Sequence, residues 1–203
     1  MSHHKVNTGE SSSKLNRRTF LLSSVSAAAG LALWAWRRSS LVEAAAAKNQ
    51  PGEVTIVQFS DAGVRLKKAR VAKVVKTEEE WQKLLTPAAF NITRHAGTEF
   101  AYSGKYWDLH DKGIYRCICC DNALFSSDTK FESGTGWPSF WAPIAAENVK
   151  TSSDLSLGME RDAVSCTQCD AHLGHVFDDG PKPTHLRYCM NSASMRFVAA
   201  KTA

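Results

Sequence analysis

The sequence has almost no excess of positive charge once its first 47 residues are set aside. Residues 1–47 hold six Lys/Arg and two Asp/Glu, which is +4 of the formal net charge of +5 and leaves +1 for residues 48–203. A nucleic-acid-binding domain would gather Lys and Arg on one face. We therefore expect no nucleic-acid partner.

Residues 48–203 also lack internal repeats and low-complexity stretches, which excludes solenoid architectures. The chain has 203 residues, of which 43% are hydrophobic and 22% charged, enough to bury one core. We expect one globular domain and a monomer.

A long hydrophobic run is missing as well. The apolar stretch Phe20–Trp36 has 17 residues, the lower limit for a membrane span, and contains serines and alanines. Arg17 and Arg18 precede it, and four alanines ending at Ala47 follow it. This arrangement is similar to a twin-arginine export signal with a cleavage site near Ala46 or Ala47, so we expect an exported, periplasmic protein. The alternative is an uncleaved signal that anchors the protein in the membrane.

These features divide the chain into three parts. Residues 1–47 are the predicted export signal, residues 48–76 an N-terminal extension of the mature chain, and residues 77–200 the main domain. The extension should contain a strand at residues 54–59, followed by a basic stretch without a clear secondary-structure signal.

Two short helices are predicted at the start of the main domain. Thr77 and Glu80 have the spacing of a capping box, so a helix should begin there and run through Leu85. Pro87 suits the first position of a second helix, which Gly97 should end in a left-handed conformation. Beyond these helices, short runs rich in Tyr, Ile, Phe and Val alternate with turn clusters, a pattern typical of antiparallel sheet.

Four of the six cysteines form two pairs with the same spacing, Cys117/Cys120 and Cys166/Cys169. This spacing lets two thiolates on a tight turn face one tetrahedral ion, and two such turns make a closed four-cysteine site. Zinc is favoured over structural iron, and a saturated sulfur shell indicates a structural role. The 45 residues between the pairs imply that the metal joins two distant hairpins.

Three alternatives compete with the metal site: disulfides, a thioredoxin-like redox pair, and coincidence. A domain of this size does not need disulfides, and a redox pair would have one such motif in a βαβ setting. Cys119 could replace Cys120 as a ligand, but two intervening residues give the better geometry. Cys119 is therefore expected to be free.

Cys189 stands apart from the other cysteines, in a segment that reads as a strand. Alternate side chains of a strand share a face, so Arg187, Cys189 and Asn191 would point away from the core together. A thiol beside a permanent cation favours the thiolate and hence nucleophilic attack. The alternative is that Cys189 is a small buried apolar residue.

His172 and His175 directly follow the second cysteine pair. A regular strand would place them on opposite faces, but a bulge at Gly174 would bring them to one side, where they could donate protons. The alternative is that they are additional ligands or orienting groups of the metal. Trp137 follows a tight glycine turn and either walls an apolar pocket or belongs to the core.

Five segments carry a resemblance to a known family: TRHAGTE, SGKYWD, KFESGTGWPSFW, HLGHVFDDGP and LRYCMNSASMRF. Together with the cysteine pairs, they resemble the B-type methionine sulfoxide reductases, the peptide-methionine (R)-S-oxide reductases. The resemblance covers residues 77–197 and implies a mainly β fold of two antiparallel sheets around a core, with short N-terminal helices.

The resemblance also implies the roles of the site residues. One structural zinc would be bound by Cys117, Cys120, Cys166 and Cys169. The reacting groups would be Cys189 as nucleophile, Trp137 against the substrate methyl, His172, His175 and Asn191 around the sulfoxide, and Arg187 and Asp179 in support.

The implied activity is reduction of methionine (R)-sulfoxide in oxidised proteins or peptides, leaving a sulfenic acid on Cys189. A thioredoxin-like protein or another thiol must then supply electrons. Many family members carry a second, resolving cysteine where this chain has Thr135. Either Cys119 or an external thiol must therefore meet the sulfenic acid, and the external thiol is favoured because Cys119 lies within a metal-binding turn.

Two other functions remain as hypotheses. The first is a zinc-ribbon binding module without catalysis, in which the lone thiol is incidental. The second is a periplasmic thiol sensor, in which peroxide oxidises Cys189 directly. Neither hypothesis accounts for the histidine pair and the Gly-Trp turn occurring together with Cys189.

Overall fold

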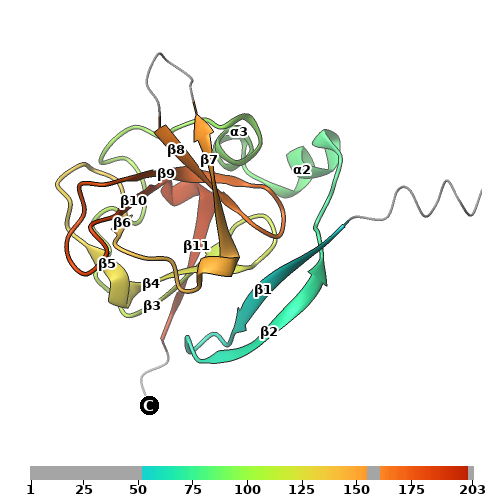
Figure 1. Ribbon diagram of the computed structural model, residues 1–203. Helices are drawn as coiled ribbons and strands as arrows, with labels where there is room; N and C mark the ends of the chain where they lie inside the picture. Colours follow the sequence, from blue (N-terminus) through green and yellow to red (C-terminus); the bar gives the residue numbers. More distant parts are fainter. Residues whose placement is uncertain (1–51, 155–160, 201–203) are drawn as a thin grey trace, which may run out of the picture. The chain divides into compact units, whose positions relative to one another are not determined.

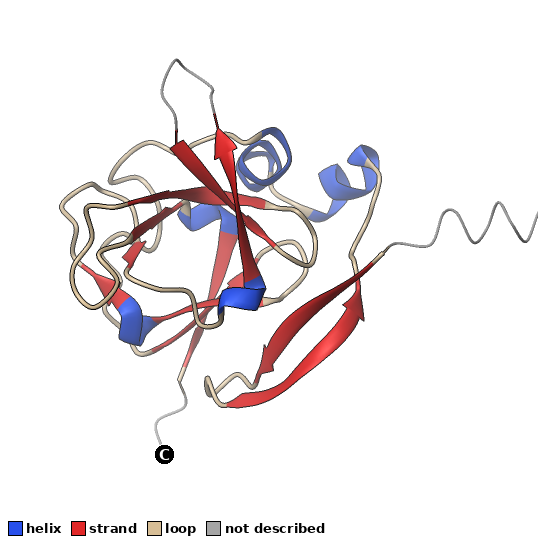
Figure 2. Ribbon diagram, in the orientation of Figure 1, coloured by secondary structure: helices blue, strands red, loops and turns tan. Residues whose placement is uncertain are grey.

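The computed structural model describes residues 52–154 and 161–200, so the predicted export signal lies outside the described residues. Strands dominate the fold and form three antiparallel sheets (Figure 2). The six-stranded sheet has the order β5 (Lys130–Phe131), β6 (Ser139–Phe140), β10 (Arg187–Met190), β9 (His172–Phe177), β8 (Arg161–Cys166) and β7 (Val149–Asp154). The three-stranded sheet has the order β11 (Met195–Ala199), β3 (Gly113–Cys117) and β4 (Ala123–Ser126). The mainly β prediction with two antiparallel sheets around a core is confirmed.

The third sheet is a hairpin of β1 (Glu53–Phe59) and β2 (Arg65–Ala72), drawn in blue-green in Figure 1. The strand predicted at residues 54–59 is confirmed as β1. The basic stretch that follows it, for which the sequence predicts no secondary structure, forms β2. Its strand conformation is set by hydrogen bonding to β1 and not by an apolar pattern of its own. The side chains of β2 are mostly exposed, which explains why it lacks an alternating apolar pattern.

Both predicted helices are present, as α2 (Glu78–Leu84) and α3 (Pro87–His95), and the capping box of Thr77 and Glu80 forms as expected. The residue in the left-handed conformation after α3 is Ala96, with φ 52°, so the prediction for Gly97 was wrong by one residue. Gly97 packs closely against Asn91 instead, since a Cβ there would lie 2.5 Å from Asn91 Nδ2 and 3.2 Å from the Asn91 carbonyl oxygen. Short 3-10 turns also occur, namely η1 (Ser127–Thr129), η2 (Ala146–Asn148) and η4 (Ser192–Ser194). Among the described residues, none of the helices has the length and apolar character needed to span a bilayer.

The core lies between the two larger sheets and is rich in aromatic rings. Phe125 of β4 stacks on Phe140 of β6 at 4.5 Å between ring centroids, and Tyr115 of β3 meets Phe140 edge-on at 5.0 Å. Leu173 of β9 and Met190 of β10 are fully buried in the same cluster. Offset and edge-on pairs of this kind add to the stability gained by burial. The strand that carries Cys189 is therefore held on its inner face by this core.

Strand β9 contains a bulge that sets the position of both histidines. Val164 of β8 pairs with Gly174, but the next residue, Ser165, pairs with His172, so Leu173 is the extra residue. A bulge is present as predicted, although its extra residue is Leu173 rather than Gly174, and the rings of His172 and His175 lie 5.2 Å apart. Gly174 is required because a Cβ there would lie 2.1 Å from the carbonyl oxygen of Cys189 on β10.

We predict that Gly174→Ala destabilises the fold by about 1–3 kcal/mol, because β10 must shift to relieve the overlap. Urea unfolding measures the effect. Gly52→Ala is the matched control, since a Cβ at Gly52 meets no atom within 4 Å. Unfolding midpoints that are equal for both variants would contradict the close approach of β9 and β10.

Candidate active site and metal centre

The four paired cysteines converge on one point from two hairpins. Cys117 and Cys120 lie at the turn between β3 and β4, and Cys166 and Cys169 lie at the turn between β8 and β9. Their sulfur atoms all lie within 4.8 Å of one another. The prediction that Cys120, rather than Cys119, completes the set is confirmed, and the four cysteines come from two distant hairpins as expected.

The geometry of this cluster fits a tetrahedral metal ion. Sγ of Cys117 is 3.6 Å from Sγ of Cys169, and Sγ of Cys120 is 3.5 Å from Sγ of Cys166. Sulfur atoms bound to zinc at about 2.3 Å are separated by about 3.8 Å in a regular tetrahedron. All six cysteines of the chain are free of disulfides, so the disulfide alternative is not supported. The four thiols can hold a metal, and their number leaves no open position for a substrate.

The two cysteine turns have the same backbone design. In each, the residue after the second cysteine, Asp121 or Asp170, adopts a left-handed conformation with φ 67° or 58°. Its N–H donates to the carbonyl of the first cysteine at 3.0 Å in both turns. Asn122 Nδ2 of the first turn also lies 3.6 Å from Sγ of Cys166 in the second. The turns are therefore fixed locally and cross-linked to each other.

Cys189 lies on the wall of a small cavity of about 160 Å³. It stands opposite His175 of β9 and Ser139 of β6, so the three side chains share one face of the sheet. The predicted outward orientation holds for Cys189, which is partly exposed while Met190 is buried in the core, but Asn191 follows the end of β10 and is buried. The remaining lining residues are Thr98, Trp137, Gly174, Phe177, Met190 and Asn191. The volume suits one side chain rather than a larger cofactor.

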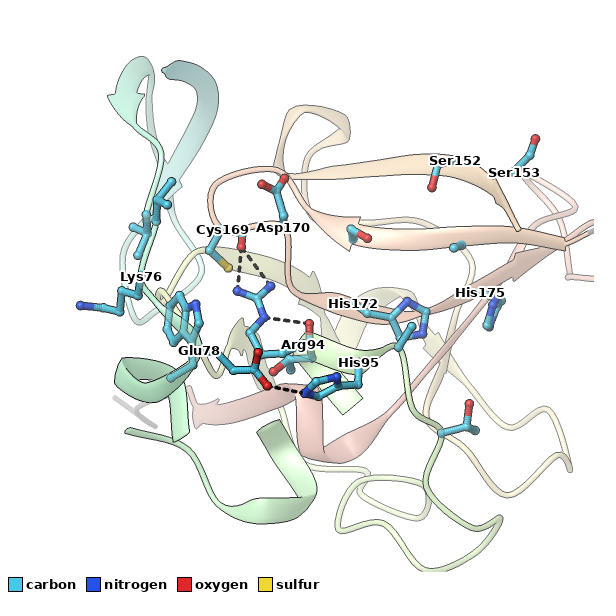
Figure 3. A pocket seen from close by; sticks show the side chains of 18 residues that line it. Lys76, Glu78, Arg94, His95, Ser152, Ser153, Cys169, Asp170, His172 and His175 are labelled. Carbon is cyan, nitrogen blue, oxygen red and sulfur yellow. Dashed lines mark hydrogen bonds and ion pairs between the residues drawn. The ribbon is translucent and has the colours of Figure 1, made fainter. Parts of the chain in front are cut away.

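A larger cavity of about 860 Å³ adjoins the first and is shown in Figure 3. It lies among helices α2 and α3 and strands β7, β8 and β9, and His175 and Thr98 line both cavities. His172 faces the larger cavity and not the smaller one. Arg94 reaches across its floor and donates to the carbonyl of Cys169 at 3.1 Å, which ties α3 to the second cysteine turn. The two histidines therefore lie where the small cavity joins the larger one.

Arg187 and Asp179 form a bidentate ion pair beside Cys189, with both N···O distances 2.8 Å. The guanidinium also stacks on Phe177 at 4.4 Å from the ring centroid, and Phe177 lines the small cavity. The pair lowers the pKa of Asp179 and raises the pKa of Arg187, so both stay charged at neutral pH. Asp179 thus acts on the cavity only through Arg187.

The expectation that the surroundings of Cys189 favour its thiolate needs correction. Burial raises the pKa of the Cys189 thiol above its ordinary value, and the Arg187 charge and the hydroxyls of Thr135 and Ser139 offset only part of this rise. Thr135 Oγ1 is 4.0 Å from Cys189 Sγ, and Ser133 Oγ contacts the hydroxyls of Thr135 and Ser139 at 2.8 and 2.7 Å. These hydroxyls line one side of the thiol and can solvate a developing charge.

Glu99 is a site residue that the sequence patterns did not single out. Its carboxylate accepts from the backbone N–H groups of Ser192 and Ala193 at 2.6 and 3.0 Å, in the turn that follows the Cys189 strand. Its own N–H donates to Asn191 Oδ1 at 3.0 Å, and its carbonyl accepts from Trp137 Nε1 at 3.1 Å. One loop residue therefore positions both Trp137 and Asn191. It lies in a loop without periodicity, and only its place in the TRHAGTE segment marks it.

Asn191 is 2% exposed, and both ends of its amide are engaged. Oδ1 accepts from Glu99, and Nδ2 donates to the carbonyl of Leu173 at 3.1 Å. The same carbonyl accepts from the Asn191 backbone N–H at 2.8 Å. Because a primary amide has a second N–H, Asn191 can fix the loop and still present a donor to the cavity.

The seven predicted site residues thus divide into three groups. Cys189, Trp137, His175 and Asn191 line the small cavity. His172 is next to His175 in the larger cavity. Arg187 and Asp179 lie behind the thiol as an ion pair.

We predict that Arg187→Gln shifts the alkylation of Cys189 to higher pH by about one unit, because removing a nearby cation raises the thiol pKa further. Iodoacetamide labelling followed by peptide mass spectrometry measures this directly for Cys189 in the whole protein. Arg187→Lys keeps the charge and should shift the profile less. A profile unchanged in Arg187→Gln would show that the guanidinium does not act on the thiol.

Comparison with known proteins identifies the family of the chain. The model of the SelR domain matches residues 85–199. The chain is 56% identical over 127 residues to the peptide methionine sulfoxide reductase MsrB of Herminiimonas arsenicoxydans, covering 63% of this chain and 93% of that protein. It is 56% identical over 124 residues to the MsrB of Thioalkalivibrio sulfidiphilus, covering 61% and 90%. To the chloroplastic peptide methionine sulfoxide reductase B1 of Arabidopsis thaliana it is 56% identical over 124 residues, covering 61% of each chain. The chain therefore belongs to the SelR domain family, which includes the MsrB peptide methionine sulfoxide reductases.

Proposed function

We propose that the protein reduces the R epimer of methionine sulfoxide in oxidised proteins or peptides, with Cys189 as the nucleophile. The observation that carries this proposal is that Cys189 opens onto a cavity of side-chain size, together with Trp137, His175 and Asn191. The names of the relatives state an activity on peptide methionine sulfoxide, which supports the same reading.

The chemistry follows from these neighbours. Sγ of Cys189 attacks the sulfoxide sulfur, the oxygen is transferred to Cys189, and the substrate leaves as methionine. The thiol proton is retained in the products, so one thiol and one sulfoxide give one sulfenic acid and one thioether. His175 stands opposite Cys189 and is placed to pass a proton to the sulfoxide oxygen.

The remaining site residues support this step. Trp137 packs against the methyl group of the substrate, and its ring is fixed by the hydrogen bond to Glu99. The Arg187–Asp179 pair stabilises negative charge on Cys189, which burial opposes. The polypeptide around the oxidised methionine lies along the larger cavity, where His172 is located.

Recycling requires a thiol from outside the chain. Thr135 Oγ1 lies 4.0 Å from Cys189 Sγ, and a hydroxyl cannot form a disulfide. Cys119 lies in the first cysteine turn, where its neighbours include Cys117, Cys169 and Thr93, and it lines neither cavity of the site. A thioredoxin-like protein or a small thiol therefore attacks the sulfenic acid, releases water and leaves a mixed disulfide. A second thiol of the donor then restores Cys189.

We further propose that zinc occupies the four-cysteine cluster and stabilises the fold. The metal would supply cross-linking of two sheets rather than chemistry on the substrate, because its sulfur shell is complete. Cys189 and its neighbours carry out the reaction without it.

We predict turnover of one epimer from a mixed-epimer methionine sulfoxide peptide in the presence of dithiothreitol, and loss of turnover in Cys189→Ser by at least about a thousandfold. Chiral chromatography of the remaining peptide gives both results. Cys119→Ser is the matched control and should keep its activity with dithiothreitol. The absence of turnover in the unsubstituted protein would leave only the binding-module and thiol-sensor hypotheses.

We propose in addition that the protein is exported to the periplasm. The support is the sequence alone, in which Arg17 and Arg18 precede the apolar stretch Phe20–Trp36. The twin-arginine route carries proteins that are already folded, which would allow the metal site to form first.

Replacing Arg17 and Arg18 with Lys should keep the precursor in the cytoplasm, because lysine does not substitute for the paired arginines of such signals. Cell fractionation with an antibody to the mature domain is the measurement. Undiminished periplasmic signal from the double variant would refute the twin-arginine reading.

A further inference from the structure

The β1–β2 hairpin, residues 53–72, lies outside the residues matched by the SelR domain, and the proposed reaction uses none of its side chains. It is nevertheless bound tightly to the rest of the domain. Val57 is 0% exposed and Ile56 is 5% exposed. Arg116 Nη2, from β3, donates to the carbonyl of Phe59 at 2.9 Å. The hairpin is therefore an integral part of the folded domain, although the proposed reaction does not use it.

Asn148 connects the hairpin to both cysteine turns. Val57 N–H donates to Asn148 Oδ1 at 2.7 Å, and Asn148 Nδ2 donates to the carbonyls of Val57 and Ala123 at 2.8 and 2.7 Å. The Asn148 carbonyl accepts from Asn122 Nδ2 and from the Thr167 N–H, both at 3.1 Å. Asn122 and Ala123 follow the first cysteine turn, and Thr167 lies within the second. One fully buried residue thus holds the hairpin against the metal site.

The end of the hairpin is fixed to the second cysteine turn in the same way. Val74 N–H donates to the carbonyl of Gln168 at 2.8 Å, and Gln168 lies between Cys166 and Cys169. Lys73 Nζ pairs with Asp170, directly after Cys169. The chain that leaves the hairpin therefore contacts the second cysteine turn directly.

The inner side of the hairpin faces the most accessible of the four sulfur ligands. Cys117, Cys166 and Cys169 are 1%, 0% and 3% exposed, whereas Cys120 is only partly buried. Cys120 lines a cavity of about 300 Å³ between the hairpin and the first cysteine turn. The hairpin side chains that line this cavity are Ile56, Val57, Gln58, Phe59, Leu66 and Val71. Most of them are apolar, whereas the opposite side of the cavity is polar, so access to Cys120 from the hairpin side passes between these two surfaces; the polar residues are Arg116, Asp121, Asn122 and Gln168.

We propose that the hairpin covers Cys120 and slows the attack of solvent oxidants on the metal site. The proposal rests on zinc occupying the four-cysteine cluster. An enzyme that repairs oxidised methionine works in the presence of the oxidants that produce it, so its own zinc thiolates need protection.

The damaging reaction can be written for hydrogen peroxide. The peroxide O–O bond breaks, one oxygen forms a sulfenic acid on Cys120, and the other leaves as water after protonation. The Cys166 thiolate, 3.5 Å away, then attacks that sulfur and expels hydroxide, which gives a disulfide and a second water. In total the two thiolates lose two electrons, and the peroxide is reduced to two waters. Zinc loses two of its four ligands and is released.

The test uses the full chain, after its zinc content has been shown to be one per molecule. Val57→Asp and Val57→Ala loosen the hairpin, and Val64→Asp and Val64→Ala make the same changes at a hairpin position that is 59% exposed. Zinc release under hydrogen peroxide is followed with a metallochromic dye. We expect release roughly fivefold faster in Val57→Ala, faster again in Val57→Asp, and unchanged in both Val64 variants, because truncating a buried side chain raises the population of locally open states. Peptide mass spectrometry should find Cys120 oxidised before the other three ligands.

Equal release rates in all variants would overturn the proposal. So would zinc loss from the Val57 variants that is as fast without peroxide, since that would reflect weaker metal binding rather than lost shielding. If Val57→Asp does not fold, Val57→Ala against Val64→Ala gives the comparison. A chain that contains no zinc at the start would contradict the metal site itself, and the hairpin proposal would fall with it.

Discussion

The convergence of four thiols from two hairpins is the constraint on which the rest of the structure depends. The β3–β4 hairpin belongs to the three-stranded sheet and the β8–β9 hairpin to the six-stranded sheet, so the cysteine cluster lies where the two sheets meet at one end. The rings of Tyr115, Phe125 and Phe140 fill the space between the sheets. Strand β9 leaves the second cysteine turn directly, and its bulge presents His172 and His175. Strand β10 then pairs with β9 and carries Cys189. The cysteine cluster and the cavity beside Cys189 are thus separate sites, and strand β9 connects them.

The pKa of the Cys189 thiol is set by opposing effects. Burial in a small cavity favours the neutral thiol, while Arg187 and two hydroxyls favour the thiolate. Desolvation also strengthens each nearby charge and dipole, so the groups that stabilise the thiolate act more strongly than they would in water. The net result is that the pKa of Cys189 is raised, so the thiol stays protonated to higher pH than an exposed cysteine.

Features set by short-range rules could be predicted from the sequence. The capping box at Thr77, the spacing of the cysteine pairs and the alternation around Cys189 each depend on residues within a few positions of one another. Features set by distant partners could not. Glu99 reaches residues 93 and 94 positions away, and β2 is recognisable only through its pairing with β1. The pKa of Cys189 was misjudged for the same reason, because the neighbouring Arg187 is visible in the sequence and burial is not.

The assignment of Cys189 as the group that accepts the sulfoxide oxygen is tested most directly by a single turnover without reductant. One equivalent of methionine should form, and mass spectrometry with a sulfenic acid trap should find the modification on Cys189 while Cys119 stays a free thiol. Thr135→Cys should instead give a disulfide between positions 135 and 189, since Thr135 Oγ1 already lies 4.0 Å from Cys189 Sγ. Methionine formed with Cys189 unmodified, or a Cys119–Cys189 disulfide as the main product of the unsubstituted protein, would contradict the account.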